Sequence, residues 1–155
     1  KQYRMNIAIQ KATELGVSRI IPCITEYTNV RKINVKNLLD NAIEASEQSE
    51  RNDIPKIEKE IEFSKLILDW PEDRLLIFCD EKENTNTGII KKLKQLKNYL
   101  NKSAILIGPE GGFSENEREM LQNKDKVIPV SLGNRLLRSD TAIAVSLFSI
   151  EQLLV

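Results

Sequence analysis

The chain has 155 residues, of which 41% are hydrophobic and 30% are charged, as is typical of one soluble globular domain. Its 23 Lys and Arg residues balance its 23 Asp and Glu residues, so no global basic field indicates a polyanionic partner. Histidine is absent, which excludes Ser-His-Asp and Cys-His nucleophile pairs and most zinc sites, so no metal is expected. The chemistry must therefore use Arg, Lys, carboxylates, hydroxyls, the backbone or a reactive cofactor.

The two cysteines, Cys23 and Cys79, are far apart and lack CxxC spacing. This usage favours a reducing compartment and predicts small, buried, unreactive thiols. No run of apolar residues approaches the roughly 20 residues that a membrane span needs, and no signal peptide is visible. We therefore expect a cytoplasmic protein with no membrane segment.

Helical and extended patterns alternate along the first half of the chain. Apolar spacing predicts a helix over 5–15, a strand over 19–25, a helix over 35–49, a strand over 57–61 and a helix over 63–70. Gly16 is a suitable stop for the first helix, and Pro71 closes the last of these helices. Pro22 inside the first strand indicates an edge strand or an early end.

The second half continues the alternation. The predicted elements are a strand over 75–79, a lysine-rich helix over 88–100, strands over 104–107 and 127–131, and helices from 114 and over 141–154. The unbroken apolar run 75–79 is typical of a strand that is covered on both faces. Ser114 and Glu117 have the spacing of a capping box, and the last helix, uncharged until Glu151, is expected to be well buried. The chain therefore predicts one α/β domain, residues 1–155, with a mostly parallel sheet flanked by helices.

A glycine-rich turn follows the strand over 104–107. Gly108-Pro-Glu-Gly-Gly112 stands where the carboxyl end of a parallel strand meets the ligand-binding edge of the sheet. The spacing matches neither GxGxxG nor GxxxxGK[ST], and no lysine follows to neutralise a triphosphate. A nucleoside held by backbone amides fits better, while a plain tight turn with two glycines is the alternative.

A second turn, Leu132-Gly133, ends the next strand. Leu136 and Leu137 supply an apolar surface, and Arg138 stands just before a helix that Ser139 or Asp140 opens. An adenine ring requires such flat apolar walls with a few backbone donors and acceptors. The arginine can clamp a phosphate or stabilise negative charge on a substrate base, whereas Asp140 has the alternative role of a helix cap.

Four segments together carry a resemblance to a known family. They are Glu14-Leu-Gly-Val17, Glu47-Gln-Ser-Glu-Arg51, Ile107 to Ser114, and Leu132-Gly-Asn-Arg-Leu-Leu-Arg-Ser-Asp-Thr-Ala142. In this order they resemble the RsmE family of 16S ribosomal RNA (uracil-N3)-methyltransferases, which belongs to the SPOUT superfamily. The resemblance covers essentially the whole chain.

The resemblance implies a homodimeric enzyme that uses S-adenosylmethionine to methylate a uridine of 16S ribosomal RNA, in the small ribosomal subunit. It also implies a deep trefoil knot in the C-terminal part, which sequence reasoning alone would not propose because chains are almost always unknotted. The cofactor-binding residues that it implies are Ile107, Gly108, Pro109, Glu110, Gly111, Gly112, Leu132, Gly133, Leu136 and Leu137.

The resemblance also implies roles in catalysis and RNA binding. Arg138 is expected to stabilise negative charge on the uracil, and Glu110 or Asp140 to accept the N3 proton. Gln48 and Arg51, together with Arg138, are the expected RNA contacts. For Arg51 the alternative is a favourable positive charge at a helix C-terminus.

The chain departs from the family pattern at several points. Glu50 replaces a usual glycine, Tyr27 stands where an arginine is common, and Asp140 replaces a glutamate. The family's N-terminal PUA-like RNA-binding domain, which precedes the position of Lys1, is absent from this chain. Alternatives are a SPOUT methyltransferase for another RNA position, an inactive knotted module for RNA binding or dimerisation, and a generic nucleotide-binding module that would bind ATP.

Overall fold

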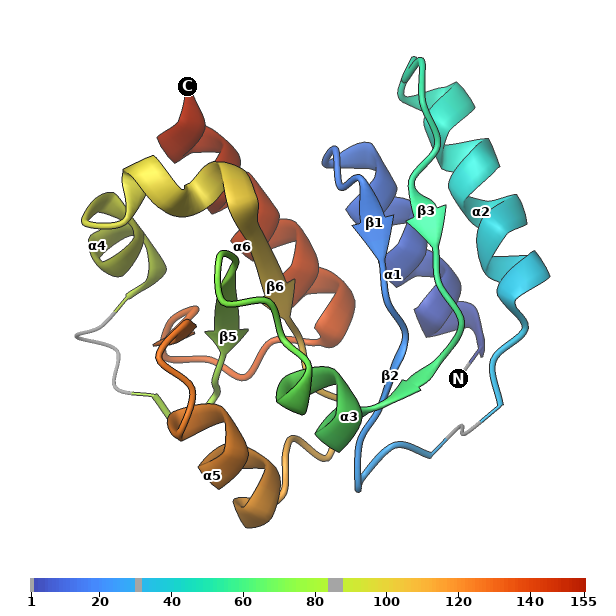
Figure 1. Cartoon of the computed structure of the whole chain (residues 1–155). Helices are drawn as coiled ribbons and strands as arrows, with labels where there is room; N and C mark the ends of the chain where they lie inside the picture. Colours follow the sequence, from blue (N-terminus) through green and yellow to red (C-terminus); the bar gives the residue numbers. More distant parts are fainter. Residues whose placement is uncertain (1, 30–31, 84–87) are drawn as a thin grey trace.

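The computed structural model describes residues 2–29, 32–83 and 88–155, and its centre is a three-stranded parallel sheet (Figure 1). The strands are β5 (Leu75–Cys79), β6 (Ser103–Leu106) and β7 (Val127–Val130), in the order β6-β5-β7. Two short parallel ladders precede them: β1 (Arg19–Ile20) pairs with β3 (Lys56–Ile57), and β2 (Cys23–Ile24) pairs with β4 (Ile61–Glu62).

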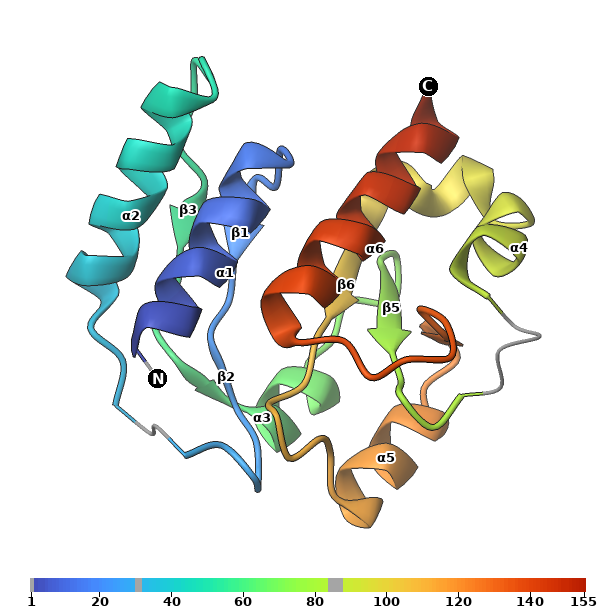
Figure 2. The same ribbon diagram turned by 180° about the vertical axis from the view of Figure 1, so that it is seen from behind.

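Helices cover both faces of this sheet, and the first two helices of the chain form a layer with the last one. The helices are α1 (Gln2–Glu14), α2 (Val35–Gln48), α3 (Phe63–Leu68), α4 (Ile89–Lys94), the 3-10 helix η2 (Lys97–Lys102), α5 (Glu115–Gln122) and α6 (Ser139–Leu154). Figure 2 shows α2, α1 and α6 side by side, and both neighbouring pairs are in contact. Within the described residues, no helix combines the length and the apolar character that crossing a bilayer requires.

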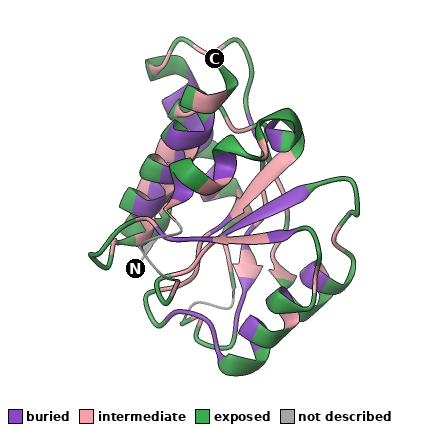
Figure 3. Cartoon of the chain, turned by 90° about the vertical axis from the view of Figure 1, so that its left-hand side faces the viewer, coloured by how far each residue is buried: buried purple, intermediate pink, exposed green. Residues whose placement is uncertain are grey.

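The alternation of side chains along β5 explains why the sheet is covered on both faces. Leu76 and Phe78 pack into a cluster with side chains of α3 and α5, while Ile77 packs into a second cluster with side chains of α4 and α6. Successive residues of a strand point to opposite faces, so an unbroken apolar run serves two cores. Figure 3 shows the buried residues gathered on the sheet and on the inward sides of the helices. The predicted parallel α/β architecture is confirmed.

Two predicted strands and one predicted helix are each divided in the structure. The single strand expected over 19–25 is wrong: β1 and β2 are separated at Pro22, which has no N–H to donate. The single strand expected over 57–61 is likewise wrong, because its two ends belong to separate strands, β3 and β4. The helix expected over 88–100 ends at Lys94, and the chain continues as η2, where Tyr99 N donates to Leu96 O at 2.8 Å in the tighter i to i+3 pattern.

Helix ends follow the sequence signals in two cases and depart from them in the third. Glu117 N donates to Ser114 Oγ at 3.2 Å and Ser114 N to Glu117 Oε2 at 2.9 Å, which confirms the capping box of α5. Gly16, with φ 84°, ends α1 as predicted. The capping role considered for Asp140 is wrong, because α6 begins at Ser139 and its N-cap is Arg138, without a side-chain cap.

The last helix is also less buried than its apolar sequence predicts. Ala142, Ser146 and Ile150 are buried, but Phe148 is 54% exposed. The small hydroxyl side chain of Ser146 is accommodated because it donates to the carbonyl oxygen of Ala142 at 2.7 Å, one turn earlier. One side of α6 therefore forms core, while the opposite side presents apolar surface to solvent.

Candidate functional site

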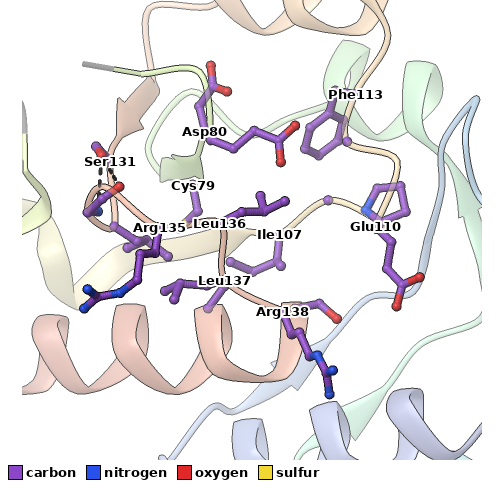
Figure 4. A pocket seen from close by; sticks show the side chains of 18 of the residues that line it. Cys79, Asp80, Ile107, Glu110, Phe113, Ser131, Arg135, Leu136, Leu137 and Arg138 are labelled. Carbon is purple, nitrogen blue, oxygen red and sulfur yellow. Dashed lines mark hydrogen bonds between the residues drawn. The ribbon is translucent and has the colours of Figure 1, made fainter. Parts of the chain in front are cut away.

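A cavity of about 540 Å³ lies at the carboxyl ends of the three central strands (Figure 4). Its walls come from the end of β5 and the two residues after it (79–81), from the segment after β6 (107–113 without Gly111) and from the segment after β7 (131–139), joined by Arg4, Arg118 and Ala142. Parallel α/β sheets bind ligands at this edge, because the strand-to-helix loops gather there. The two glycine turns that the sequence singles out therefore form one site.

The loops after β6 and β7 give the cavity an apolar wall. The side chains of Ile107, Leu136 and Leu137 lie in the middle of the site, between the two loops (Figure 4). Such a surface suits the flat face of a purine, and the neighbouring loop backbone can supply polar contacts at its edge.

The loop after β6 lies against Glu81, which follows β5, and adopts a backbone conformation that favours glycine. Gly112 has φ 70°, and a Cβ atom at this position would lie 2.7 Å from Glu81 Oε1. The Gly112 N–H donates to Pro109 O at 2.8 Å, which fixes the turn. A side chain at Gly112 would displace the Glu81 carboxylate, and both residues line the cavity.

A buried ion pair forms another part of the cavity wall. Arg118 of α5 donates to Asp80 Oδ1, and their side chains are only 7% and 11% exposed. Lys82 N donates to the same oxygen at 2.9 Å, and the Arg118 guanidinium lies 5.8 Å from the ring centroid of Phe78. Arg118 Nε is buried without a hydrogen-bond partner among the described residues. The Asp80 carboxylate is thus held in one orientation at the end of the central strand.

The structure brings together most of the predicted site residues. Every predicted cofactor-binding residue except Gly111 lines the cavity, and so do Glu110 and Arg138. Glu110 forms an ion pair with Arg4, and Figure 4 shows the charged ends of Glu110 and Arg138 on the same side of the site. Asp140 lies outside the cavity lining, in the first turn of α6.

The predicted RNA contacts Gln48 and Arg51 lie at the end of α2, outside the cavity lining. Arg51 Nη1 donates to the carbonyl oxygens of Thr13 at 2.6 Å and Val17 at 3.1 Å. The Arg51 side chain is only 12% exposed, and its guanidinium forms hydrogen bonds within the chain. Contact of these residues with RNA stays a prediction.

Sequence reasoning missed several lining residues. They are Arg4, Cys79, Asp80, Glu81, Phe113, Arg118, Ser131, Asn134, Arg135, Ser139 and Ala142. The sequence did contain a signal for three of them. The strand over 75–79 was predicted correctly, and its carboxyl end, with Cys79, Asp80 and Glu81, belongs to the edge where parallel sheets bind ligands. Arg4 and Arg118 come from helices, and no local pattern assigns them to this edge.

The thiols contribute no nucleophile to the site. Burial raises the pKa of Cys79, which lines the cavity, to about 12. Burial, followed by the negative charges of Glu117 and Glu62, raises the pKa of Cys23 to about 12. The reactive thiolate is therefore scarce at neutral pH, and the cavity is better suited to binding than to covalent chemistry.

The fold and the cavity define a class: a parallel α/β protein with a cavity between two glycine turns at the carboxyl edge of its sheet, whose apolar wall suits a nucleoside-type ligand. The family described as "RNA methyltransferase domain" matches residues 1–151. The chain belongs to this family, with the RsmE-type methyltransferase domain that its motifs resemble.

Characterised relatives and solved structures agree with this membership. The chain is 37% identical over 142 residues to the ribosomal RNA small subunit methyltransferase E of Rickettsia conorii, covering 92% of this chain and 57% of that protein. It is 33% identical over 145 residues to the protein of the same name from Bacillus subtilis, covering 86% and 55%. The chain thus spans less than two thirds of the length of these relatives.

Two solved structures contain a bound cofactor. A methyltransferase of Legionella pneumophila in complex with the cofactor SAM has a TM-score of 0.78 and 31% identity, covering 96% of this chain and 61% of that one. A ribosomal RNA small subunit methyltransferase E of Neisseria gonorrhoeae bound to S-adenosyl methionine has a TM-score of 0.79 and 27% identity, covering 99% and 62%.

Proposed function

We propose that this chain is the catalytic domain of an enzyme that transfers a methyl group from S-adenosylmethionine to N3 of a uridine in 16S ribosomal RNA. The observation that carries the proposal is the cavity between the loops after β6 and β7, in a chain of the RNA methyltransferase domain family. The names of its relatives support small-subunit ribosomal RNA as the substrate, and the uridine N3 position follows from the family that the motifs resemble. The small ribosomal subunit is the proposed partner. The cytoplasm is the proposed location because the ribosomal subunit is there.

The residues present fit this cofactor. The apolar wall of Ile107, Leu136 and Leu137 suits the adenine ring, and Gly112 lines the cavity without a side chain, so its backbone can come close to the ligand. The carboxylates of Asp80 and Glu81, which line the same cavity, suit the ribose hydroxyls or the ammonium group. When bound, S-adenosylmethionine supplies an electrophilic methyl group, so the transfer needs no metal and no covalent enzyme intermediate.

The reaction places its main demand on the uridine. N3 is a poor nucleophile while it is protonated, so the site must favour the deprotonated base, which carries negative charge on the uracil ring. Arg138 lines the cavity and keeps a permanent positive charge, so we assign it the stabilisation of this charge. N3 lies on the Watson–Crick edge, so the base must enter unpaired or flipped out of its helix.

Of the two carboxylates expected to accept the N3 proton, Glu110 has the better support. Glu110 lines the cavity and is paired with Arg4, whereas Asp140 lies outside the lining. We therefore assign the proton acceptor to Glu110 and regard Arg4 as the residue that positions its carboxylate. Among the proposed RNA contacts, Arg138 is the best supported, because Arg51 already donates to two carbonyl oxygens.

Calorimetric titration with S-adenosylmethionine, with ATP as the control ligand, tests the cofactor. Saturable binding of S-adenosylmethionine alone supports the proposal. Binding of ATP alone would mean that the two glycine turns are a generic nucleotide site. Failure of a folded chain to bind S-adenosylmethionine would favour an inactive RNA-binding or dimerisation module.

The reaction is tested by assaying methyl transfer to unmodified 16S ribosomal RNA and then determining which atom of which nucleotide carries the methyl group. Arg138→Ala is expected to bind S-adenosylmethionine normally but to lose methyl transfer. Arg74→Ala is the matched control, since Arg74 is exposed and lies outside the cavity lining, and it should behave as the wild type. Unchanged turnover in Arg138→Ala would remove this residue from the mechanism, and methylation at another atom or nucleotide would redefine the substrate.

The homodimer and the trefoil knot of the superfamily are part of this proposal. Apolar side chains stay exposed on two neighbouring helices, Tyr3 and Met5 on α1 and Val145 and Phe148 on α6, and a second copy would cover them. The loops after β6 and β7, which form the cavity, are those that the resemblance assigns to the knot. Light scattering of Phe148→Lys tests the dimer: a shift to monomer supports this interface, and an unchanged mass contradicts it.

A further inference from the structure

Tyr27 is an aromatic residue that the fold holds in place on the surface. It follows β2 in a turn where Thr28 N donates to Thr25 O at 3.1 Å and Thr25 N donates to Thr28 Oγ1 at 2.9 Å. The preceding residue, Glu26, donates its N–H to Glu117 Oε1 at 2.8 Å. Despite this fixed backbone, Tyr27 is 47% exposed.

The position of Tyr27 relative to the cavity is defined by Gly111. A Cβ atom at Gly111 would lie 3.2 Å from Tyr27 Cβ and 3.8 Å from Tyr27 Cδ2. The neighbours Glu110 and Gly112 line the cavity, but Gly111 does not. Tyr27 therefore packs against the outer side of the loop whose inner side forms the cavity wall.

The loop that Tyr27 contacts also carries a charged group of the site. Glu110, adjacent to Gly111 in the chain, is paired with Arg4, and Arg138 lies on the same side of the cavity as Glu110 (Figure 4). An exposed aromatic ring packed against a loop of a site that also contains arginines suits single-stranded nucleic acid: the ring can stack on a base while the cations attract phosphates. This combination favours RNA over an apolar protein segment as the occupant.

We propose that Tyr27 is a stacking platform for an unpaired base of the RNA substrate, next to the nucleotide that enters the cavity. The inference rests on the proposed function, because it assumes that RNA approaches the site from the side of Glu110 and Arg138. A base that leaves its helix exposes its neighbours, and an aromatic side chain can stabilise such an unstacked neighbour. Because the turn is already fixed, stacking costs little further ordering of the protein.

Kinetics of three variants test this role, with in-vitro-transcribed 16S ribosomal RNA as the substrate. Tyr27→Ala is expected to lower kcat/KM for RNA about 5- to 150-fold, the range of one base–aromatic stack, and to leave the S-adenosylmethionine affinity unchanged. Tyr27→Phe keeps the ring and should retain nearly full activity. Tyr99→Ala, which removes another exposed tyrosine from η2, is the matched control and should behave as the wild type.

The same RNA in a binding assay separates this inference from the proposed function. If the wild-type chain binds RNA but transfers no methyl group, the proposed function fails, while weaker RNA binding of Tyr27→Ala alone still supports stacking. The inference is overturned if Tyr27→Ala binds RNA as the wild type does, if Tyr27→Phe is as impaired as Tyr27→Ala, or if the wild-type chain binds no RNA. It is also overturned if Tyr27→Ala changes the oligomeric mass, because the ring would then contact a second copy.

Discussion

Arg51 donates a hydrogen bond to the last turn of α1, a helix distant from it in the sequence: its Nη1 lies 2.6 Å from the carbonyl oxygen of Thr13. The same nitrogen donates to Val17 O at 3.1 Å, and Asp53 holds the other side of the guanidinium at 2.8 Å. A cation at a helix C-terminus interacts favourably with the helix dipole and satisfies carbonyl groups that lack an intrahelical donor. Arg51 therefore joins the ends of α1 and α2.

Replacing Arg51 by Met should lower the free energy of unfolding by about 1.5–3 kcal/mol, because carbonyl oxygens in a partly buried position lose a charged donor. Urea unfolding measures the change. Arg19→Met is the matched control, since it removes an exposed ion pair with Glu58 and should cost less than about 1 kcal/mol. Equal losses in the two variants would mean that Arg51 contributes no more than a surface charge.

The two helices that Arg51 joins end in the same way but with different residues. Gly16 follows α1 with φ 84°, and Glu50 follows α2 with φ 56°, the only described residue other than glycine with a positive φ. In both, the next residue donates its N–H back to the helix: Val17 N to Ala12 O, and Arg51 N to Ser46 O. This is the Schellman motif, in which the left-handed residue is usually glycine.

The strain at Glu50 predicts that Glu50→Gly raises the free energy of unfolding by about 0.5–1 kcal/mol. The left-handed conformation costs a residue with a side chain about 1–2 kcal/mol, and the greater entropy of glycine in the unfolded chain offsets part of the gain. Gly16→Ala should have the opposite effect, about 1 kcal/mol of destabilisation, although no atom lies within 4 Å of the added Cβ. Denaturant midpoints of both variants check the pair. Destabilisation by Glu50→Gly would show that the glutamate side chain makes a compensating contact.

Features encoded by neighbouring residues could be predicted from the sequence. The capping box at Ser114, the buried strand 75–79 and the glycine stop at Gly16 each depend on groups within a few residues, and each was predicted correctly. The glycine turns at 108–112 and 132–133 were also assigned to one site, because parallel strands must end at the same edge of a sheet.

Features that depend on distant residues could not be predicted. Arg118 and Asp80 are 38 positions apart, as are Arg51 and Thr13, and their pairing requires the packed fold. The family motif around Arg51 suggested contact with RNA, and the alternative was a positive charge at a helix C-terminus. Its hydrogen bonds to Thr13 and Val17 place it at the end of α1, a partner that only the packed fold defines. The exposed side of α6 was missed for a related reason: an apolar sequence does not distinguish a core from a surface that another molecule covers.

The buried pair at the cavity predicts a large effect when one partner is removed. Arg118→Met leaves the Asp80 carboxylate buried without its cation, so we expect a loss of about 3–5 kcal/mol in the free energy of unfolding. Asp80→Asn combined with Arg118→Met should lose less than Arg118→Met alone, since the uncompensated charge is gone. Lys82→Met, which removes the exposed pair with Glu115, is the control and should change stability by less than about 1 kcal/mol.

The conformation of Gly112 predicts that a substitution there weakens ligand binding more than it lowers the stability of the fold. Gly112→Ala places a methyl group 2.7 Å from Glu81 Oε1 at a φ of 70°, so the Glu81 carboxylate must move and the loop backbone is strained. We expect at least about tenfold weaker binding of S-adenosylmethionine, because small displacements of binding groups are costly. Gly16→Ala has comparable backbone strain far from the cavity and should bind the cofactor normally. Equal affinity of Gly112→Ala and the wild type would contradict the proposed cradle.

The two thiols predict how stability changes in alkaline solution. Burial raises the pKa of Cys23 and of Cys79 from the ordinary value of 9.0 to about 12, so the folded chain keeps protons that the unfolded chain loses in this range. Their contribution is fully present below pH 9 and falls as the pH rises from 9 towards 12, by up to about 1.4 kcal/mol per thiol and pH unit. The wild type and the double variant Cys23→Ala, Cys79→Ala should be unfolded with urea at pH 8, 9.5 and 10.5. The free energy of unfolding should fall more steeply in the wild type, because exposed Lys and Tyr titrate equally in both proteins; parallel curves would mean that these thiols ionise as readily in the folded chain as in the unfolded one.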